Sequence, residues 1–414
     1  MERKKCVLCH ITSMPKIDRN NSLKFIEWMS KNDYSVWQML PINPPDQYNS
    51  PYSSTSAFAG WDKISFDESE GDIDNEGFWL NDWAYYSAIK EEYNGAPWFE
   101  WPEKLRDRDP VELSKWDEKA TRFIRQQKIF QNTWNIIRTD AKNAGVELFG
   151  DIPIFIAHDS ADVWAHRDLF LLDENGYPEF VSGVPPDYFS ETGQKWGTVL
   201  YNWTAHKADN WRWWKERIRR AFRLFDYVRI DHFRGIHSSW AVPVVDEDAR
   251  NGHWQEGPGD DLLKQIIACA PHPSKIIAED LGIIPTEVTE LRKRNNLPGM
   301  VVLQFGFDGD LEKNPNNPTN ISDDQVVYVA THDNDTTNGW WEGANQEIKA
   351  NLSKLKIESE TIVQLLVRLA EESQTQMIVI PLQDILELGS DSRMNVPGKS
   401  TGNWTWKFSW DDLN

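Results

Sequence analysis

Eight short runs of apolar residues recur along the chain, separated by longer stretches of mixed polarity. A continuous apolar run bounded by polar residues is typical of a strand in a parallel sheet, because helices cover both faces of such a sheet. The pattern therefore predicts eight buried strands. They lie at residues 6–11, 35–40, 146–156, 227–231, 275–279, 300–305, 326–330 and 377–381.

Helical periodicity fills most of the intervals between these runs. Phe130, Trp134, Ile137 and Ala141 recur at the spacing of one helix face, and Gly145 follows where a helix commonly ends. Eight strands that alternate with helices predict an α/β fold, the (β/α)8 TIM barrel. The length of 414 residues fits such a barrel with insertions.

Three intervals are too long for simple strand-to-helix connections. They are residues 43–120, 157–206 and 236–260, and each follows a predicted strand. We therefore expect a single catalytic barrel domain over residues 1–414, with insertion subdomains on the C-terminal face of the barrel. That face is where barrel enzymes hold their active sites.

Composition narrows the classes of function. The net charge of −21 argues against nucleic acid and anionic membranes as partners. The 22 tryptophans and 11 tyrosines mostly belong to the core, but they also suit a cleft in which flat rings stack on sugars. Three cysteines and the lack of any apolar run of 18 residues predict a cytoplasmic location. Cys6 and Cys9 have no second pair, so we expect no metal or redox site there.

Acidic side chains follow the predicted strands at the ends that meet at one mouth of a barrel. Neither a phosphate-binding glycine loop nor a set of histidines at metal-ligand spacing accompanies them, so we expect no cofactor and no metal. The polar residues at the strand ends are Asp151, Asp231, Glu279, Asp280, Asp308, Asp310, His332, Asp333 and Asp335.

Paired carboxylates without a metal indicate glycosyl transfer, in which one carboxylate attacks a sugar and another donates a proton. Arg229 and Asp231 share a strand face, so we expect the guanidinium to lower the pKa of Asp231 and keep this nucleophile ionised. Glu279 follows an apolar strand, and burial there is expected to raise its pKa, as an acid requires. Asp333 is the third carboxylate. Taken singly, each residue is also compatible with helix capping or a structural ion pair.

A family resemblance runs nearly end to end. The chain resembles the 4-α-glucanotransferases, the amylomaltase or disproportionating-enzyme family of the α-amylase clan. The motifs are Ser50-Pro51-Tyr52, Ser56-Ala57-Phe58-Ala59-Gly60, Gly150-Asp151-Ile152-Pro153, Asp159-Ser160-Ala161-Asp162-Val163-Trp164, Gly183-Val184-Pro185-Pro186-Asp187-Tyr188-Phe189-Ser190, Gly193-Gln194, Trp196-Gly197, Arg229-Ile230-Asp231-His232-Phe233-Arg234-Gly235, Ala278-Glu279-Asp280-Leu281-Gly282, Thr331-His332-Asp333-Asn334-Asp335, Pro381-Leu382-Gln383-Asp384, Arg393-Met394-Asn395, Pro397-Gly398 and Asn403-Trp404.

The resemblance implies Asp231 as nucleophile, Glu279 as general acid and base, and Asp333 as stabiliser of the transition state. It implies α-1,4-glucans, maltooligosaccharides and glucose as donors and acceptors, and a loop at 183–197 that overhangs the cleft. The substrate contacts that it implies are Tyr52, Asp151, Asp187, Tyr188, Trp196, Arg229, Asp308, His332 and Asn403.

Two departures from the family pattern stand out. The glycine-rich stretch that usually follows the first strand is absent, and Trp61-Asp62 replaces the expected Asn-Pro after Gly60. Both changes leave the carboxylates in place and bear on donor subsites or on the reach of long glucans. Two other functions stay open: an α-glucan hydrolase of the same clan, and a sugar-binding protein without catalysis.

Overall fold

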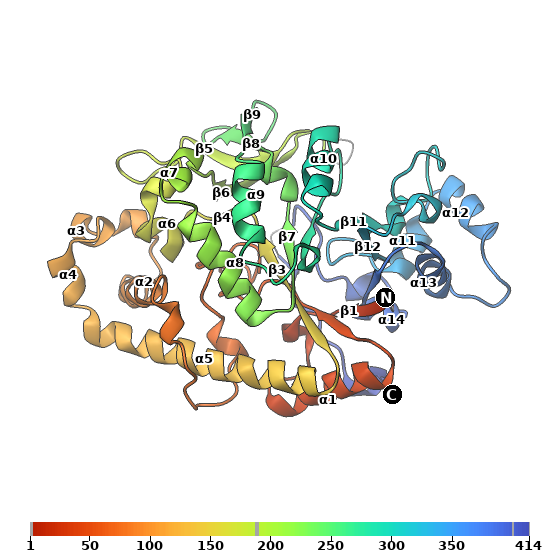
Figure 1. Ribbon diagram of the computed structural model, residues 1–414, viewed down its shortest axis with the longest axis horizontal. Helices are drawn as coiled ribbons and strands as arrows, with labels where there is room; N and C mark the ends of the chain where they lie inside the picture. Colours follow the sequence, from red (N-terminus) through yellow and green to blue (C-terminus); the bar gives the residue numbers. More distant parts are fainter. Residues whose placement is uncertain (1–2, 187–189, 400, 414) are drawn as a thin grey trace.

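A parallel sheet of eight strands forms the centre of the computed structural model, which describes residues 3–186, 190–399 and 401–413 (Figure 1). Its order is β10-β7-β3-β2-β1-β13-β12-β11. The backbone N–H of Ala278 donates to the carbonyl of Pro298 (2.8 Å) and joins the two ends of the sheet. The predicted (β/α)8 barrel is confirmed. The strands are β1 (Lys4–Leu8), β2 (Val36–Gln38), β3 (Glu147–Pro153), β7 (Tyr227–Asp231), β10 (Ile276–Ala278), β11 (Gly299–Val302), β12 (Gln325–Tyr328) and β13 (Met377–Pro381).

Each predicted strand has a counterpart in the barrel, but several end earlier than predicted, as β1 does at Leu8. The run at 146–156 is divided after Pro153, which has no N–H to continue a ladder, and its last residues form β4 (Ile156–Ala157) in another sheet. The run at 300–305 turns into a 3₁₀ helix over Leu303–Phe305. Apolar runs predict burial well, but they do not locate the residue at which pairing stops.

Amphipathic helices cover the outside of the barrel. Helix α1 buries Phe25, Ile26 and Met29, and its N-cap Asp18 accepts a hydrogen bond from the Asn21 N–H (2.8 Å). The barrel helices are α1 (Arg19–Lys31), α5 (Asp117–Asn143), α8 (Arg212–Leu224), α9 (Asp260–Ile267), α10 (Thr286–Arg294), α11 (Thr337–Gly343), α12 (Gln346–Ser353), α13 (Ile362–Glu372) and α14 (Leu382–Ile385).

A second, antiparallel sheet lies beyond the C-terminal ends of β3 and β7, at the top of Figure 1. Residues 157–206 and 236–260, which the sequence treats as separate insertions, contribute to it together, because β5 pairs with β8 along Phe180–Pro243 to Gly183–Trp240. Its order is β4-β6-β5-β8-β9, with β5 (Phe180–Val184), β6 (Gln194–Val199), β8 (Ser238–Pro243) and β9 (His253–Glu256).

The regular secondary structure within residues 43–120 is helical. Its helix α2 (Leu80–Glu92) lies against the long helix α5, at the left of Figure 1. The remaining helices of the long intervals are α3 (Glu103–Arg106), α4 (Pro110–Ser114), α6 (Ala161–Ala165) and α7 (Trp203–Ala208). The division into one barrel domain with three insertions stays a prediction. Within the described ranges, every helix is too short or too polar to cross a membrane.

A buried ion pair supports the closure of the barrel. Arg292 on α10 contacts Asp280 (2.9 Å) after β10 and Asp324 (2.9 Å) before β12. Asp280 also accepts a hydrogen bond from the Met300 N–H (2.7 Å) on β11. One of the carboxylates that the sequence places at the mouth is therefore a structural residue, because it links the first and last strands of the sheet.

Gly150 tests how tightly β3 is packed. A Cβ atom at this position would lie 2.1 Å from the ring of Phe225, which is buried beneath the strand. We expect Gly150→Ala to lower the free energy of unfolding by about 1–3 kcal/mol through overpacking, as measured by chemical denaturation. Gly77→Ala is the matched control, because nothing lies within 4 Å of its Cβ position. Equal stability of the two variants would contradict this packing.

Candidate active site

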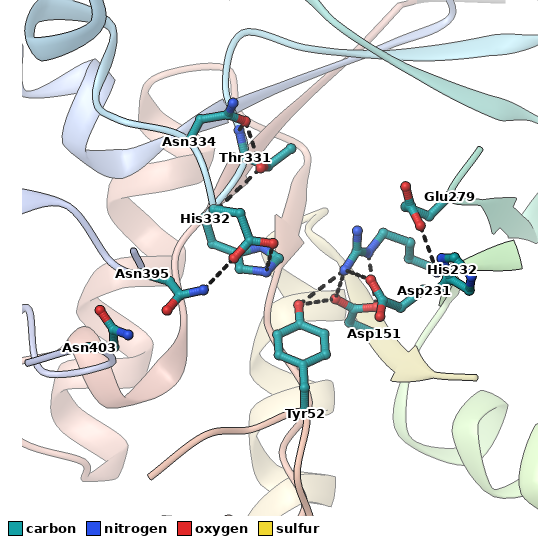
Figure 2. Close-up of polar contacts among 12 residues, drawn as sticks. Tyr52, Asp151, Asp231, His232, Glu279, Thr331, His332, Asn334, Asn395 and Asn403 are labelled. Atoms are coloured by element: carbon teal, nitrogen blue, oxygen red, sulfur yellow. Dashed lines mark hydrogen bonds and ion pairs between the residues drawn. The ribbon is translucent and has the colours of Figure 1, made fainter. Parts of the chain in front are cut away.

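Arg229 on β7 connects two carboxylates and a tyrosine. Its Nε and Nη2 donate to the two oxygens of Asp151 on β3 (2.9 and 2.7 Å), and Nη2 also donates to Asp231 (2.8 Å). Tyr52 donates to Asp151 (2.6 Å) and accepts from Arg229 Nη2 (3.1 Å). Figure 2 shows Tyr52, Asp151 and Asp231 converging on this point. Strand alternation places Arg229 and Asp231 on one face, as predicted.

The protonation of Asp231 differs from our expectation. Burial raises the pKa of Asp231 well above its ordinary value, and the charge of Arg229 opposes this rise without cancelling it. The prediction of a lowered pKa was wrong because burial outweighs the charge of Arg229, and the neighbouring Asp151 carboxylate raises the pKa of Asp231 further. The Asp231 side chain remains 30% exposed, so water also favours its ionised form.

Glu279 lies beside Asp231 on the neighbouring strand. Its backbone N–H donates to the Ile230 carbonyl (3.0 Å), which continues the β10–β7 pairing. Its carboxylate accepts from the N–H groups of His232 (2.6 Å) and Leu281 (3.1 Å). His232 adopts a left-handed backbone conformation (φ 49°), and this turn aims its N–H at Glu279. Burial raises the pKa of Glu279, in the direction that the apolar strand predicted.

Asp333 follows β12, and the adjacent His332 and the loop residue Asn395 lie at the left of Figure 2, opposite Asp231 and Glu279. One of its oxygens accepts from Asn395 (2.6 Å), and the other lies 3.3 Å from His332 Nε2. Arg393 donates to its carbonyl (2.6 Å). The Asp333 side chain is 48% exposed, so it has a fixed orientation and stays open to a ligand.

His332 is buried beside Tyr52. Burial lowers its pKa, and its ring stacks on Tyr52 with the centroids 5.1 Å apart and the planes at 13°. Tyr52 thereby connects the Arg229 cluster to the Asp333 side of the opening. The structure brings Tyr52, Asp151, Arg229 and His332 together, and their contact with substrate stays a prediction.

The other predicted contact residues are less closely joined to this cluster. Trp196 on β6 is 38% exposed and packs edge-on against His232 (centroids 4.8 Å apart). Asn403 bonds the backbone of Val396 and Lys399, so its amide orders a loop. Asp308 is exposed after β11, and no contact among the described residues joins its side chain to Arg229. Asp187 and Tyr188 lie outside the described residues.

Two residues with a role at the site were not predicted. Asn395 and Arg393 hold Asp333 from a loop that is more than sixty residues away in sequence. The sequence signal for these two residues was the family motif Arg393-Met394-Asn395, but the spacing within it does not indicate a chemical role. Within the described part of the chain, no cluster of three or more acidic, histidine or cysteine side chains is arranged to hold a metal ion.

Comparison with known proteins shows the family to which the chain belongs. The family model described as 4-alpha-glucanotransferase matches residues 10–64 and 65–412. The chain belongs to this family. A chloroplastic or amyloplastic 4-alpha-glucanotransferase of Solanum tuberosum is 39% identical over 485 residues, which cover 100% of this chain and 84% of that protein. A Synechocystis 4-alpha-glucanotransferase is 36% identical, covering 99% of this chain and 95% of that protein.

Among solved structures, the amylomaltase of Streptococcus agalactiae in complex with acarbose superposes with a TM-score of 0.92. It is 29% identical, and the match covers 100% of this chain and 96% of that one. The potato alignment runs over 485 positions although this chain has 414 residues, so relatives carry segments without a counterpart here. The family match is interrupted between Ile64 and Ser65.

Replacement of Arg229 tests the electrostatics of the cluster. Arg229→Met retains much of the packing and removes the charge that opposes protonation of Asp231. Because Asp231 must be ionised to attack, we expect the acidic limb of the activity profile to move up by at least about one pH unit, with lower activity throughout. The measurement is kcat/KM for glucan transfer against pH.

Arg138→Met serves as the control, since Arg138 pairs with Asp226 (3.0 Å) away from the cluster. Its profile should match that of the unmodified protein. An unchanged acidic limb in Arg229→Met would mean that Arg229 has only a structural role.

Proposed function

We propose that this protein transfers α-1,4-glucan segments from a donor maltooligosaccharide, or a glucan derived from starch or glycogen, to the 4-OH of an acceptor glucan or glucose. The reaction is a retaining double displacement through a covalent glycosyl-enzyme. The observation that carries the proposal is the pairing of Asp231 with Glu279, whose carboxylate is held by the N–H of the residue after Asp231. Retention needs two carboxyl groups about 5–5.5 Å apart, and neighbouring strands, about 4.8 Å apart, suit that spacing.

In the first step, the Asp231 carboxylate attacks C1 of the donor sugar and forms an ester bond. Glu279 gives its proton to the glycosidic oxygen, and the bond between C1 and that oxygen breaks. The reducing-end part of the donor leaves with a free 4-OH, and the non-reducing-end segment stays on Asp231. In the second step, Glu279 takes the proton from the acceptor 4-OH as that oxygen attacks C1, and Asp231 leaves as a carboxylate. Burial raises the pKa of Glu279, as an acid requires, while the hydrogen-bonded Arg229 guanidinium opposes protonation of Asp231.

Asp333 completes the mechanism as the stabiliser of the oxocarbenium-like transition state. Asn395 and His332 fix both of its oxygens, while the exposed part of the side chain is available to sugar hydroxyls. A group held in advance costs little reorganisation when charge develops. Tyr52, Asp151 and Arg229 act on the nucleophile's side, where they set its orientation and its ionisation.

A hydrolase shares every step until deglycosylation, when water replaces the acceptor. Incubation with maltotriose alone separates the two functions. We expect a ladder of longer maltooligosaccharides together with glucose, because each glycosyl-enzyme is captured by another sugar. Chromatography of the products is the measurement. Shorter sugars alone would identify a hydrolase, and unchanged maltotriose would favour the sugar-binding alternative.

The assignment of roles is tested by trapping the intermediate. Glu279→Gln removes the acid and the base, whereas α-maltosyl fluoride needs little protonation to leave. We therefore expect a covalent adduct of maltosyl mass, mapped by peptide mass spectrometry to Asp231, and a burst of fluoride equal to the enzyme concentration.

Addition of Asp231→Ala should abolish both the adduct and the burst. Asp280 offers a matched comparison, because it is the adjacent carboxylate and is committed to Arg292. An adduct on Asp280 or Asp333 would mean that the nucleophile is assigned wrongly.

The cellular location stays a prediction. We infer a cytoplasmic location from the cysteine content, and the Solanum tuberosum relative is described as chloroplastic or amyloplastic.

A further inference from the structure

Trp404, near the end of the chain, contacts two residues of the catalytic cluster. Its ring centroid lies 5.9 Å from that of Tyr52 and 6.0 Å from that of His332. We propose that Trp404 is a positioning residue, which holds Tyr52 and His332 where the catalytic carboxylates need them. The inference rests on the proposed function, because it concerns the alignment of the same carboxylates.

The three rings pack against one another although they come from distant parts of the chain. Tyr52 lies on the loop after β2, and His332 follows β12 (both are labelled in Figure 2). These two rings are stacked with their planes at 13°, whereas the plane of Trp404 is tilted by 47° to Tyr52 and by 41° to His332. Because each ring contacts both of the others, loss of the indole removes the common neighbour of the stacked pair.

Both rings that the indole contacts lead to a carboxylate of the proposed mechanism. The Tyr52 hydroxyl accepts from Arg229 Nη2 (3.1 Å), which also donates to Asp231 (2.8 Å). His332 Nε2 lies 3.3 Å from an Asp333 oxygen. A tilt of Tyr52 or His332 therefore moves a partner of the nucleophile or of the stabilising carboxylate. Misplacement of a reacting group by about 1 Å can lower a rate about a hundredfold.

The backbone of Trp404 is in the left-handed region, where a side chain is unfavourable. Its φ angle is 64°, a conformation that glycine adopts without strain. A strained residue persists only where its surroundings hold it, and such residues are concentrated at functional sites. The chain therefore keeps an indole at a position where glycine would relax the backbone, which supports a role for the ring itself.

Backbone hydrogen bonds hold the segment on both sides of this residue. The Trp404 N–H donates to the Met394 carbonyl (2.8 Å) and closes the loop that carries Asn395. Further along, the Phe408 N–H donates to the Ser13 carbonyl (3.0 Å) in the connection after β1. The indole is therefore anchored before it contacts the catalytic rings, and an anchored group can fix the position of its neighbours.

Two substitutions separate the ring from the strained backbone. Trp404→Gly removes the indole and relieves the strain, whereas Trp404→Ala removes the indole and retains a Cβ atom, so the glycine variant should have the higher melting temperature. We expect both to lower kcat for maltotriose by the same factor, about tenfold, with KM within about twofold, because the ring aligns groups for the transition state. A kcat that rises with the melting temperature, up to the normal value in Trp404→Gly, would overturn the proposal.

Larger side chains at the same position cover the case in which the two small variants do not fold. Trp404→Phe retains a flat ring, and we expect its kcat to lie within about threefold of the normal value. Trp404→Leu retains apolar bulk without a ring, and we expect the tenfold fall in kcat to persist. A normal kcat in Trp404→Leu, or a tenfold fall in folded Trp404→Phe, would contradict the role of the ring.

Trp410→Ala is the matched control, because Trp410 belongs to the same segment and its Nε1 donates to Asn21 (2.6 Å) instead of reaching the catalytic rings. It should lower the melting temperature and leave kcat and KM within about twofold. A tenfold fall in its kcat would mean that any loosening of the segment has this effect, and the proposal would fail. If the unmodified protein does not convert maltotriose, the proposed function fails, whereas normal conversion by Trp404→Gly overturns this inference alone.

Discussion

The division of one guanidinium between two carboxylates underlies the arrangement of the active site. Arg229 is almost fully buried and has Asp151 on one side and Asp231 on the other. Loss of either carboxylate would leave the buried Arg229 guanidinium without full charge compensation, which would destabilise the fold. The side-chain contact between β3 and β7, the hydrogen bond to Tyr52 and the ionisation of Asp231 therefore all involve the Arg229 guanidinium. A change in any of them alters the others.

Glu279 and Asp280 illustrate how adjacent carboxylates acquire different tasks. Glu279 faces the mouth of the barrel and is held by two backbone N–H groups. Asp280 points the other way, toward Arg292 and the N–H of Met300, where it links β10 to β11. Alternation along an extended chain separates the two side chains. The closure of the barrel is thus reinforced by the residue next to the proposed acid, and this link helps to fix where that acid lies.

Sequence reasoning succeeded where a property depends on neighbours along one strand. The eight strands, the shared face of Arg229 and Asp231, and the raised pKa of Glu279 all belong to this class. It failed where partners come from distant segments. Examples are the pairing of β5 with β8, the hydrogen bond from Asn395 to Asp333, and the ion pair between Asp151 and Arg229. None of these contacts produces a periodic pattern in the sequence. The pKa of Asp231 was predicted in the wrong direction for this reason, since its burial depends on the assembled mouth.

The antiparallel sheet that two separate segments build has a consequence for synthesis. β5 can pair with β6 soon after it is made, but its other edge requires β8, which follows roughly sixty residues later, or about 3–12 s at 5–20 residues per second. An unpaired edge is a template for association with other chains. During that interval the nascent protein presents an open strand above an unfinished barrel, so the order in which the ribosome delivers the strands sets a period of vulnerability that the finished fold no longer displays.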